Sequence, residues 1–463
     1  MSQSPSASPS NMTAKLTTGS ITGHLVGQTL PAIIGVTAVM SIGLVDAYFI
    51  GQLGPDALAA IAFIFPVTVA LSSLGVGVMV GINSVVARAL GEGDVQRCAR
   101  RANFGLVFAV VLGVVMGAAL YVLLEPLFTL MNAPPHLRKL ILEYMQPFSL
   151  GFPLVLAIMG FNGVLRGQGE AKRTSYISIT YAAANWVLDP ILITGAFGFE
   201  GYGIAGAAYA TIIGYSLGAV LAFILLRQTD LPVDFSLIRE GSWVDPAISI
   251  LRVAGPASFS NSINPIGMSI LTAVIATQGE AAVAGFGAAG RLQGLATVPL
   301  LALSGSIGAI VGQNWGAREY NRARQAALYA FGFCVVWGLA LVAVTVPLAA
   351  WFAGFFTSEA DIVDQFVLYI EITAWGYAGF GTLIVANGIL NAIDKASYAL
   401  SQSAARVFLI MLPFAWLLLP SWGSAAVFSA ELAANIFGGL TGVALAYWLL
   451  TRHAPDNLPR SRA

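Results

Sequence analysis

Long apolar stretches follow one another along almost the whole chain and are separated by short polar segments. Each stretch can cross a bilayer as a helix, since a spanning helix needs about 20 apolar residues. Twelve stretches are predicted to do so, at residues 24–50, 57–84, 103–130, 143–165, 175–196, 203–227, 248–276, 281–311, 325–355, 363–390, 397–420 and 424–451. The pattern therefore predicts an all-α polytopic membrane protein with twelve transmembrane helices.

The second half of the chain repeats the first. Gly91 and Gly316 are separated by the same distance along the chain as Arg97 and Arg322, and NGVL at residues 162–165 returns as NGIL at residues 387–390. Parallel repeats of this kind are a common transporter architecture. We therefore expect two pseudo-symmetric six-helix bundles. The predicted segments are a disordered cytoplasmic tail at 1–22, an N-terminal lobe at 23–229, a cytoplasmic linker at 230–246, a C-terminal lobe at 247–453 and a cytoplasmic tail at 454–463.

Basic residues indicate how the helices are oriented. Arg97, Arg100 and Arg101 follow the stretch 57–84, and Arg318 and Arg322 follow the stretch 281–311, whereas the alternate loops carry few basic residues. Cytoplasmic loops are enriched in Lys and Arg, so both termini are expected in the cytoplasm. Residues 1–22 hold no hydrophobic run of a signal peptide. We expect a multi-pass protein of the plasma (inner) membrane.

Composition excludes several function classes. The chain is 57% hydrophobic, only 10% charged and carries no formal net charge, so no nucleic-acid partner is expected. Its two cysteines and three histidines are scattered, and they form no metal-ligand pattern. We expect no enzyme activity, no cofactor and no metal centre beyond a possible Na⁺ ion. The expected partners are the lipid bilayer and small molecules.

Two acidic residues lie inside predicted spanning helices. Asp46 and Asp189 stand in the apolar runs 24–50 and 175–196. A carboxylate near the centre of a bilayer costs roughly 2.5–3.5 kcal/mol, so such groups rarely persist without pairing, binding a cation or carrying a proton. Asn185 lies four residues before Asp189 and shares its helix face. The oxygen atoms of this face suit Na⁺, and a desolvated carboxyl also suits H⁺, so the residues alone leave both ions open.

Other polar residues in the predicted helices are weaker candidates. Those that can line a cavity or form charge pairs are Glu371, Arg291, Arg406, Asn261 and Asn264. Glu125 and Glu431 lie near predicted helix ends, where an interfacial position is expected.

Several motifs carry a family resemblance over residues 20–450. GLVDAYFIGQLGPDALAA, ARALGEGDVQRCARRA, NGVLRGQGEAKRTSY and NWVLDPILI, in this order, resemble the multidrug and toxic compound extrusion (MATE) family. The segment FGAAGRLQGLATVP, with Arg291, is similar to the prokaryotic DinF-like branch. The resemblance implies a monomeric antiporter that expels organic cations, drugs or toxic amphiphiles by alternating access. The driving ion is H⁺ or Na⁺, and the DinF-like branch favours H⁺.

The resemblance also implies roles for individual residues. The family's N-lobe cation site corresponds to Asp46, Asn185, Asp189 and Thr211, and the proline that bends in its first helix corresponds to Pro31. One departure is Ile42, which stands where some members have a tyrosine. The stretch 248–276 lacks the central glutamate of the NorM branch, which argues against a C-lobe cation site of that kind.

The sequence also bears on three alternative function classes. The basic loop GEGDVQRCARR lacks the full major-facilitator pattern, and no zinc pair or GxSxG motif indicates an intramembrane enzyme. A lipid-linked precursor flippase of the same superfamily is the more serious alternative. Such proteins tend to place cations in the central cavity to hold diphosphate. The N-terminal half has no intramembrane Lys or Arg, but Arg291 and Arg406 keep this alternative open.

Overall fold

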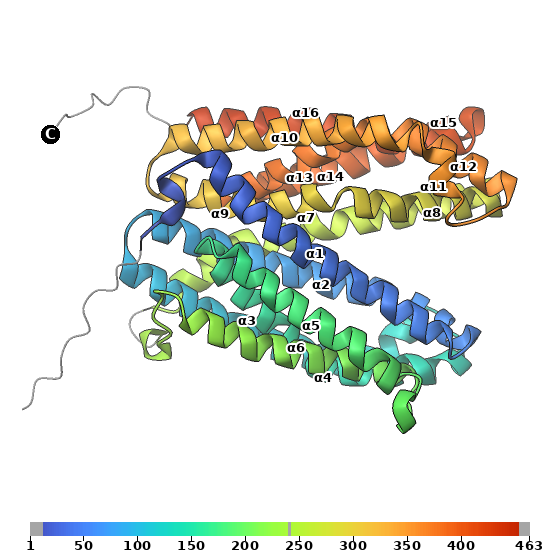
Figure 1. Ribbon diagram of the computed structural model, residues 1–463, viewed down its shortest axis with the longest axis horizontal. Coiled ribbons are helices and arrows are strands. Elements are labelled where there is room, and N and C mark those ends of the chain that lie inside the picture. The colour runs from blue at the N-terminus through green and yellow to red at the C-terminus, as the bar shows by residue number, and fades with distance from the viewer. Residues whose placement is uncertain (1–12, 239–241, 453–463) are drawn as a thin grey trace, which may run out of the picture. The chain divides into compact units, whose positions relative to one another are not determined.

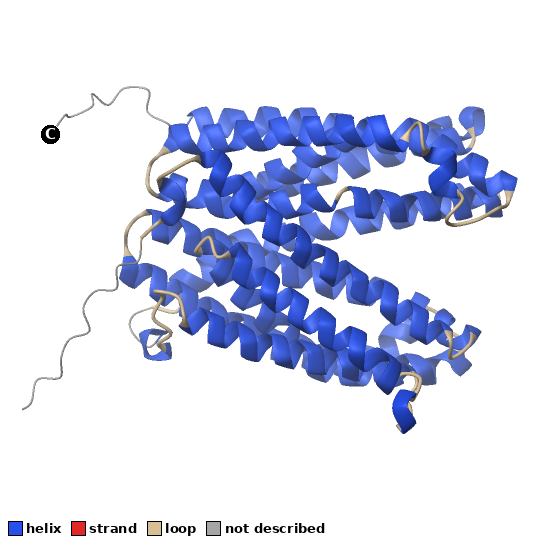
Figure 2. Ribbon diagram, in the orientation of Figure 1, coloured by secondary structure: helices blue, strands red, loops and turns tan. Residues whose placement is uncertain are grey.

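The computed structural model describes residues 13–238 and 242–452, which are almost entirely helical (Figures 1 and 2). The α-helices are α1 (Ile21–Gly51), α2 (Pro55–Gly91), α3 (Val95–Leu130), α4 (Pro135–Gly167), α5 (Ala171–Leu192), α6 (Ile204–Arg227), α7 (Val244–Ile275), α8 (Glu280–Ala296), α9 (Val298–Gly316), α10 (Tyr320–Thr345), α11 (Ala349–Ala353), α12 (Ala360–Thr373), α13 (Tyr377–Ala392), α14 (Ala396–Ala404), α15 (Leu412–Trp422) and α16 (Ser424–Arg452). Short 3₁₀ turns are η1 (Lys15–Thr17), η2 (Ala196–Gly198), η3 (Phe235–Ile238), η4 (Ala276–Gln278) and η5 (Ala374–Gly376), and η6 (Ala405–Met411) is π-helical.

The predicted fold class, an all-α polytopic membrane protein, is confirmed. Ten helices or helix runs in the described residues are long and apolar enough to span a bilayer, and α8 with α9, bent by 45°, can form an eleventh. All twelve predicted stretches lie on helices, but α5 is not among these spans. Its polar residues, Asn185 and Asp189 included, lower its hydropathy, and these are the residues that mark it as a candidate site.

The chain divides into two compact units. The N-terminal unit comprises Met1–Lys15 and Leu30–Ser258, and the C-terminal unit comprises Leu16–Thr29 and Phe259–Ala463. Both α1 and α7 therefore contribute residues to each unit, whereas the predicted lobes, 23–229 and 247–453, each contain one of these helices whole. The residue limits of the predicted lobes stay a prediction.

Within the N-terminal unit, α4 packs against α2, α3 and α6, and α5 pairs with α6 (Figure 1). Glycine lets these helices approach closely: a Cβ atom added at Gly117 of α3 would lie 2.4 Å from the carbonyl oxygen of Ser149 on α4. Within the C-terminal unit, α13 packs against α9, α10 and α16. Small residues at helix contacts are typical of membrane proteins, where backbones pack directly on one another.

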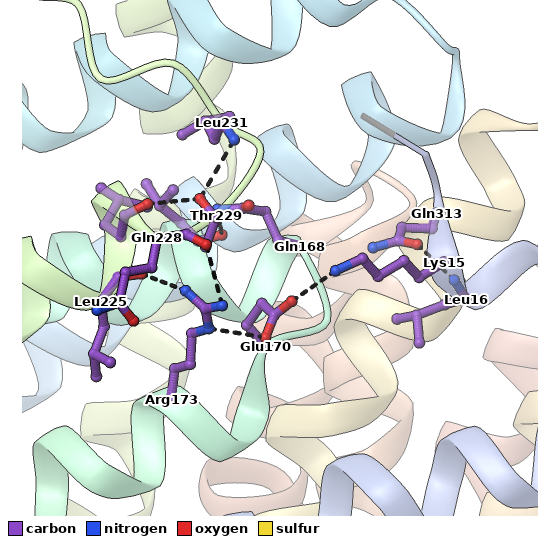
Figure 3. Close-up of polar contacts among 12 residues, drawn as sticks. Lys15, Leu16, Gln168, Glu170, Arg173, Leu225, Gln228, Thr229, Leu231 and Gln313 are labelled. Atoms are coloured by element: carbon purple, nitrogen blue, oxygen red, sulfur yellow. Dashed lines mark hydrogen bonds and ion pairs between the residues drawn. The ribbon is translucent and has the colours of Figure 1, made fainter. Parts of the chain in front are cut away.

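The segment before α1 is ordered from residue 13 onward. The backbone amide of Leu16 donates to Oε1 of Gln313 over 3.1 Å, and the Leu16 side chain is buried (Figure 3). The predicted disordered tail 1–22 therefore extends too far along the chain. Lys15 forms an ion pair of 2.9 Å with Glu170, which also pairs with Arg173 at the start of α5 (Figure 3). Residues 1–12 and the predicted tail 454–463 lie outside the described residues.

The predicted linker 230–246 is partly ordered and is anchored to α3. The buried side chain of Asn103 donates to the carbonyl oxygen of Pro232 over 2.8 Å and accepts a bond of 3.1 Å from the backbone amide of Asp234. The turn η3 follows, and α7 begins at Val244, within the predicted linker. Residues 239–241 lie outside the described residues.

Candidate functional site

The two intramembrane aspartates lie together in the N-terminal unit. Asp46 is half-buried near the end of α1, and Asp189 is fully buried near the end of α5. Their carboxyl groups are close enough to interact directly. Oδ1 of Asp46 and both carboxyl oxygens of Asp189 are buried and have no hydrogen-bond partner among the described residues. Buried polar oxygens are nearly always satisfied, so this set is an exception that requires a functional explanation.

Asn185 and Thr211 extend the set of oxygen atoms. Asn185, one turn before Asp189, is buried, and its Nδ2 donates to Oγ1 of Thr211 on α6 over 3.4 Å. Its Oδ1 has no partner among the described residues. The hydrogen bond to Thr211 engages the amide nitrogen and leaves the amide oxygen available, one turn before Asp189. The geometry thus brings together the residues that the resemblance assigned to one cation site.

The two carboxyl groups are not balanced by a paired cation in the described part of the chain. No Lys or Arg side chain in the described ranges forms an ion pair with Asp46 or Asp189. Buried Tyr144 on α4 lies near both carboxyl groups, and Tyr215 on α6 lies near Asp46; neither tyrosine was identified from the sequence. Adjacent carboxyl groups in a low-dielectric site favour a shared proton or a bound hard cation, since like charges repel there.

Pro31 lies within α1, which continues as one α-helix from Ile21 to Gly51. The carbonyl oxygen of Pro31 accepts a hydrogen bond of 2.6 Å from Oγ of Ser175 on α5. Gly35, one turn later, also faces Ser175: a Cβ atom there would lie 3.3 Å from the Cα atom of Ser175. Pro31 is thus linked to the helix that carries Asp189.

The remaining predicted residues belong to the C-terminal unit. Arg291, Glu371 and Asn261 are exposed, and neither Arg291 nor Glu371 forms an ion pair with a described residue. Arg406, in contrast, is buried, and its Nη1 donates to Oδ1 of Asn264 on α7 over 2.9 Å. The structure therefore brings together Arg406 and Asn264 and leaves the other three outside this contact.

Glu431 lies near the start of α16, and its expected interfacial position in the membrane stays a prediction. It is buried on α16, and its oxygens accept hydrogen bonds of 2.8 Å from Nε2 of Gln293 and 2.9 Å from the hydroxyl of Tyr369. The hydrogen bonds that Gln293 and Tyr369 donate to Glu431 permit burial of its carboxylate. The position of Glu431 near a helix end does not indicate this burial. A signal was available in the sequence: Asn435 follows one turn later on the same face of α16.

Comparison with known proteins identifies the family of this fold. The MatE family model matches residues 31–191 and 256–417. The chain is 32% identical over 396 residues to the FAD transporter of Shewanella oneidensis, covering 84% of this chain and 86% of that protein. It is 25% identical over 440 residues to the probable multidrug resistance protein NorM of Pseudomonas aeruginosa, covering 92% and 89%.

A solved structure matches almost the whole fold. It is the outward-facing conformation of a multidrug resistance MATE family transporter of the MOP superfamily, with a TM-score of 0.88, 26% identity and coverage of 95% of this chain and 98% of that chain. The family match spans most of the chain, and the helical fold agrees with it. The chain is therefore a membrane transporter that belongs to the MATE family.

Proposed function

We propose that this transporter is a cation-coupled antiporter in which the Asp46–Asp189 pair exchanges a coupling ion for cargo. The observation that supports this proposal is the set of buried, unpartnered oxygens on Asp46, Asn185 and Asp189. A buried carboxyl without donors has a large free-energy cost in its charged form. That cost is removed when the site holds a proton or a cation.

Exchange follows from competition for one negative pocket. Binding of the coupling ion from outside neutralises the pair, which weakens its attraction for a cationic cargo and releases the cargo outward. Loss of the ion toward the cytoplasm restores the charge and prepares the site for the next cargo. We favour H⁺ over Na⁺ because two carboxyl groups in direct contact can share one proton.

Relatives indicate the cargo class. The similarity to probable multidrug resistance proteins supports organic cations, drugs or toxic amphiphiles. The FAD transporter of S. oneidensis, at 32% identity, supports a second candidate cargo, a flavin nucleotide. The motif with Arg291 supports a place in the DinF-like branch. We further propose a monomer in the inner membrane with both termini in the cytoplasm, on the basis of the basic loops.

The test is ethidium efflux from proteoliposomes under a pH gradient alone and then under a Na⁺ gradient alone. We expect the pH gradient to drive efflux and Asp189→Asn to abolish it while the protein stays folded. The matched control is Asp56→Asn, which removes an exposed carboxyl in the same unit at the start of α2. Efflux by Asp189→Asn at the wild-type rate would contradict the proposed site. Efflux driven by the Na⁺ gradient alone would show that Na⁺, and not H⁺, is the coupling ion.

A further inference from the structure

We propose that the C-terminal unit contains an oxyanion-binding site, built on Arg406 and Asn435, that takes a phosphate group of the cargo. The inference rests on the proposed transport of small molecules and adds a cargo feature that the N-terminal carboxyl pair cannot recognise. The two sites have opposite character, because one holds buried acceptors without donors and the other holds buried donors without acceptors.

Arg406 is a buried cation without an anionic partner. Its side chain is 3% exposed, its Nη1 donates to Asn264 and its Nη2 donates to Oδ1 of Asn435 over 2.6 Å. Nε has no hydrogen-bond partner, and no carboxylate in the described ranges forms an ion pair with this guanidinium. A buried guanidinium whose hydrogen bonds go to neutral amide groups has a large desolvation free energy. A guanidinium group also suits two-point binding of phosphate.

Asn435 supplies a second donor, on a side chain that is hydrogen-bonded to Arg406. It is fully buried on α16, and its Oδ1 must face Arg406 because a guanidinium group donates and cannot accept. This orientation leaves Nδ2 as a buried amide donor, and Nδ2 has no partner among the described residues. Arg406 Nε and Asn435 Nδ2 therefore belong to two hydrogen-bonded side chains that both lack an acceptor. An oxyanion supplies the missing acceptors.

Glu431 does not supply the acceptors that Arg406 Nε and Asn435 Nδ2 lack. It lies one turn before Asn435 and close enough to Arg406 to interact electrostatically. Its two oxygens, however, already accept hydrogen bonds from Gln293 and Tyr369. Glu431 thus offsets the buried positive charge from a distance and leaves Nε of Arg406 available for a ligand.

The local backbone makes room for the arginine. Arg406 lies in the π-helical segment η6, and single π-helical turns are frequent at functional sites. Gly438 of α16 allows the arginine stem to pass, since a Cβ atom there would lie 3.1 Å from its Cδ. The ring of Phe380 on α13 covers one face of the guanidinium at 5.6 Å, which leaves the edge with its N–H groups for the ligand.

The test compares riboflavin, FMN and FAD, which share one ring system and differ in phosphate. Binding to the full-length protein in detergent is measured by quenching of flavin fluorescence. We expect wild type to bind FMN and FAD at least about tenfold more tightly than riboflavin, since a charge-assisted hydrogen bond contributes that much. Arg406→Met is expected to lose about ten- to a hundredfold for FMN and FAD while keeping riboflavin affinity, and Arg406→Lys to lose less.

Asn435→Asp is the second variant, and it keeps the buried arginine satisfied. The new carboxylate has the shape of the amide and forms an ion pair with Arg406, so the protein should fold while the anion site is closed. Loss of the phosphate preference in both Arg406→Met and Asn435→Asp supports the site. Equal affinity for all three flavins in wild type, or no flavin binding, overturns it.

A lipid headgroup is the other source of phosphate. The measurement is repeated in nanodiscs of neutral phosphatidylcholine and in nanodiscs containing phosphatidylglycerol. If phosphatidylglycerol weakens FMN binding to wild type but not to Arg406→Met, the result supports the same site with a lipid headgroup as its ligand. An FMN affinity that does not depend on Arg406 in either lipid overturns the proposal. Ethidium efflux by wild type and Asp189→Asn stays an independent measure of the proposed coupling.

Discussion

The hydroxyl of Ser175 on α5 donates a hydrogen bond of 2.6 Å to the carbonyl oxygen of Pro31 on α1. Proline cannot donate to the helix ladder and loosens the helix around it, so α1 is weakened at this point. The bond from Ser175 ties the loosened turn to the helix that carries Asn185 and Asp189. A change in the charge of the carboxyl pair can therefore reach Pro31 along α5.

Ser175→Ala tests this link. Loss of one buried hydrogen bond is expected to cost about 1 kcal/mol of stability. We also expect slower ethidium efflux with unchanged ethidium affinity, because the variant alters α1 and leaves the pair intact. Thr174→Ala on the same turn, which bonds only within α5, is the control. Equal efflux rates for Ser175→Ala and wild type would show that the link has no role in transport.

The carboxyl pair should act as one unit. Asp46→Asn and Asp189→Asn are each expected to reduce pH-driven efflux at least about tenfold, and the double variant is expected to be no worse than either single variant, because residues that share one function are strongly non-additive. The measurement is the initial efflux rate from proteoliposomes. Independent, additive losses would show that the two carboxyl groups serve separate steps.

Thr211 should have a smaller effect than the acidic residues. Thr211→Val removes the acceptor for Asn185 Nδ2, which frees the amide to turn and place its nitrogen beside the carboxyl groups. We expect a two- to tenfold loss of efflux, about 0.4–1.4 kcal/mol, since the 3.4 Å hydrogen bond is long. Thr211→Ser keeps the hydroxyl and should retain wild-type activity. A loss in Thr211→Ser equal to that in Thr211→Val would point to packing of the methyl group instead.

The N-terminal site could be predicted from the sequence because the free-energy cost of an acidic residue in a spanning helix is visible in the local sequence. Asp46 and Asp189 stand in apolar runs, where any acidic residue is conspicuous, and the i, i+4 spacing of Asn185 and Asp189 fixes their shared face. Tyr144 and Tyr215 could not be found in this way, because tyrosine is common in helices and only the packing of α4 and α6 brings them near the pair.

The C-terminal network depends on contacts between helices, which the sequence does not specify. The position of Glu431 near a predicted helix end indicates an interfacial residue, but it does not indicate the donors from α12 and α8 that permit burial of the side chain. The same limit applies to Leu16. Its apolar side chain stands in a polar tail, and only Gln313 and Asn314 of α9, distant in sequence, hold its backbone in place.

The linker is expected to depend on Asn103. This buried side chain bonds to the backbone at both Pro232 and Asp234, so Asn103→Ala leaves two backbone groups of the linker without their partners. We expect a loss of about 1–3 kcal/mol and faster proteolysis between residues 228 and 246. Gln52→Ala, an exposed change after α1, is the control. Unchanged cleavage of the linker in Asn103→Ala would show that other contacts hold it.

Neutralising Asp189 and Glu431 should change stability in opposite directions. Asp189 has no donor for either oxygen, and its amide variant can donate to the carboxyl group of Asp46, so Asp189→Asn removes an electrostatic cost and should raise the melting temperature by about 2 °C or more. Both oxygens of Glu431 accept hydrogen bonds, so Glu431→Met leaves Nε2 of Gln293 without its acceptor and should cost about 1–3 kcal/mol. Thermal unfolding of both variants and wild type in one detergent measures the difference. A lower melting temperature for Asp189→Asn would mean that the pair is a structural contact, and its unpartnered oxygens would then no longer support an ion-coupling site.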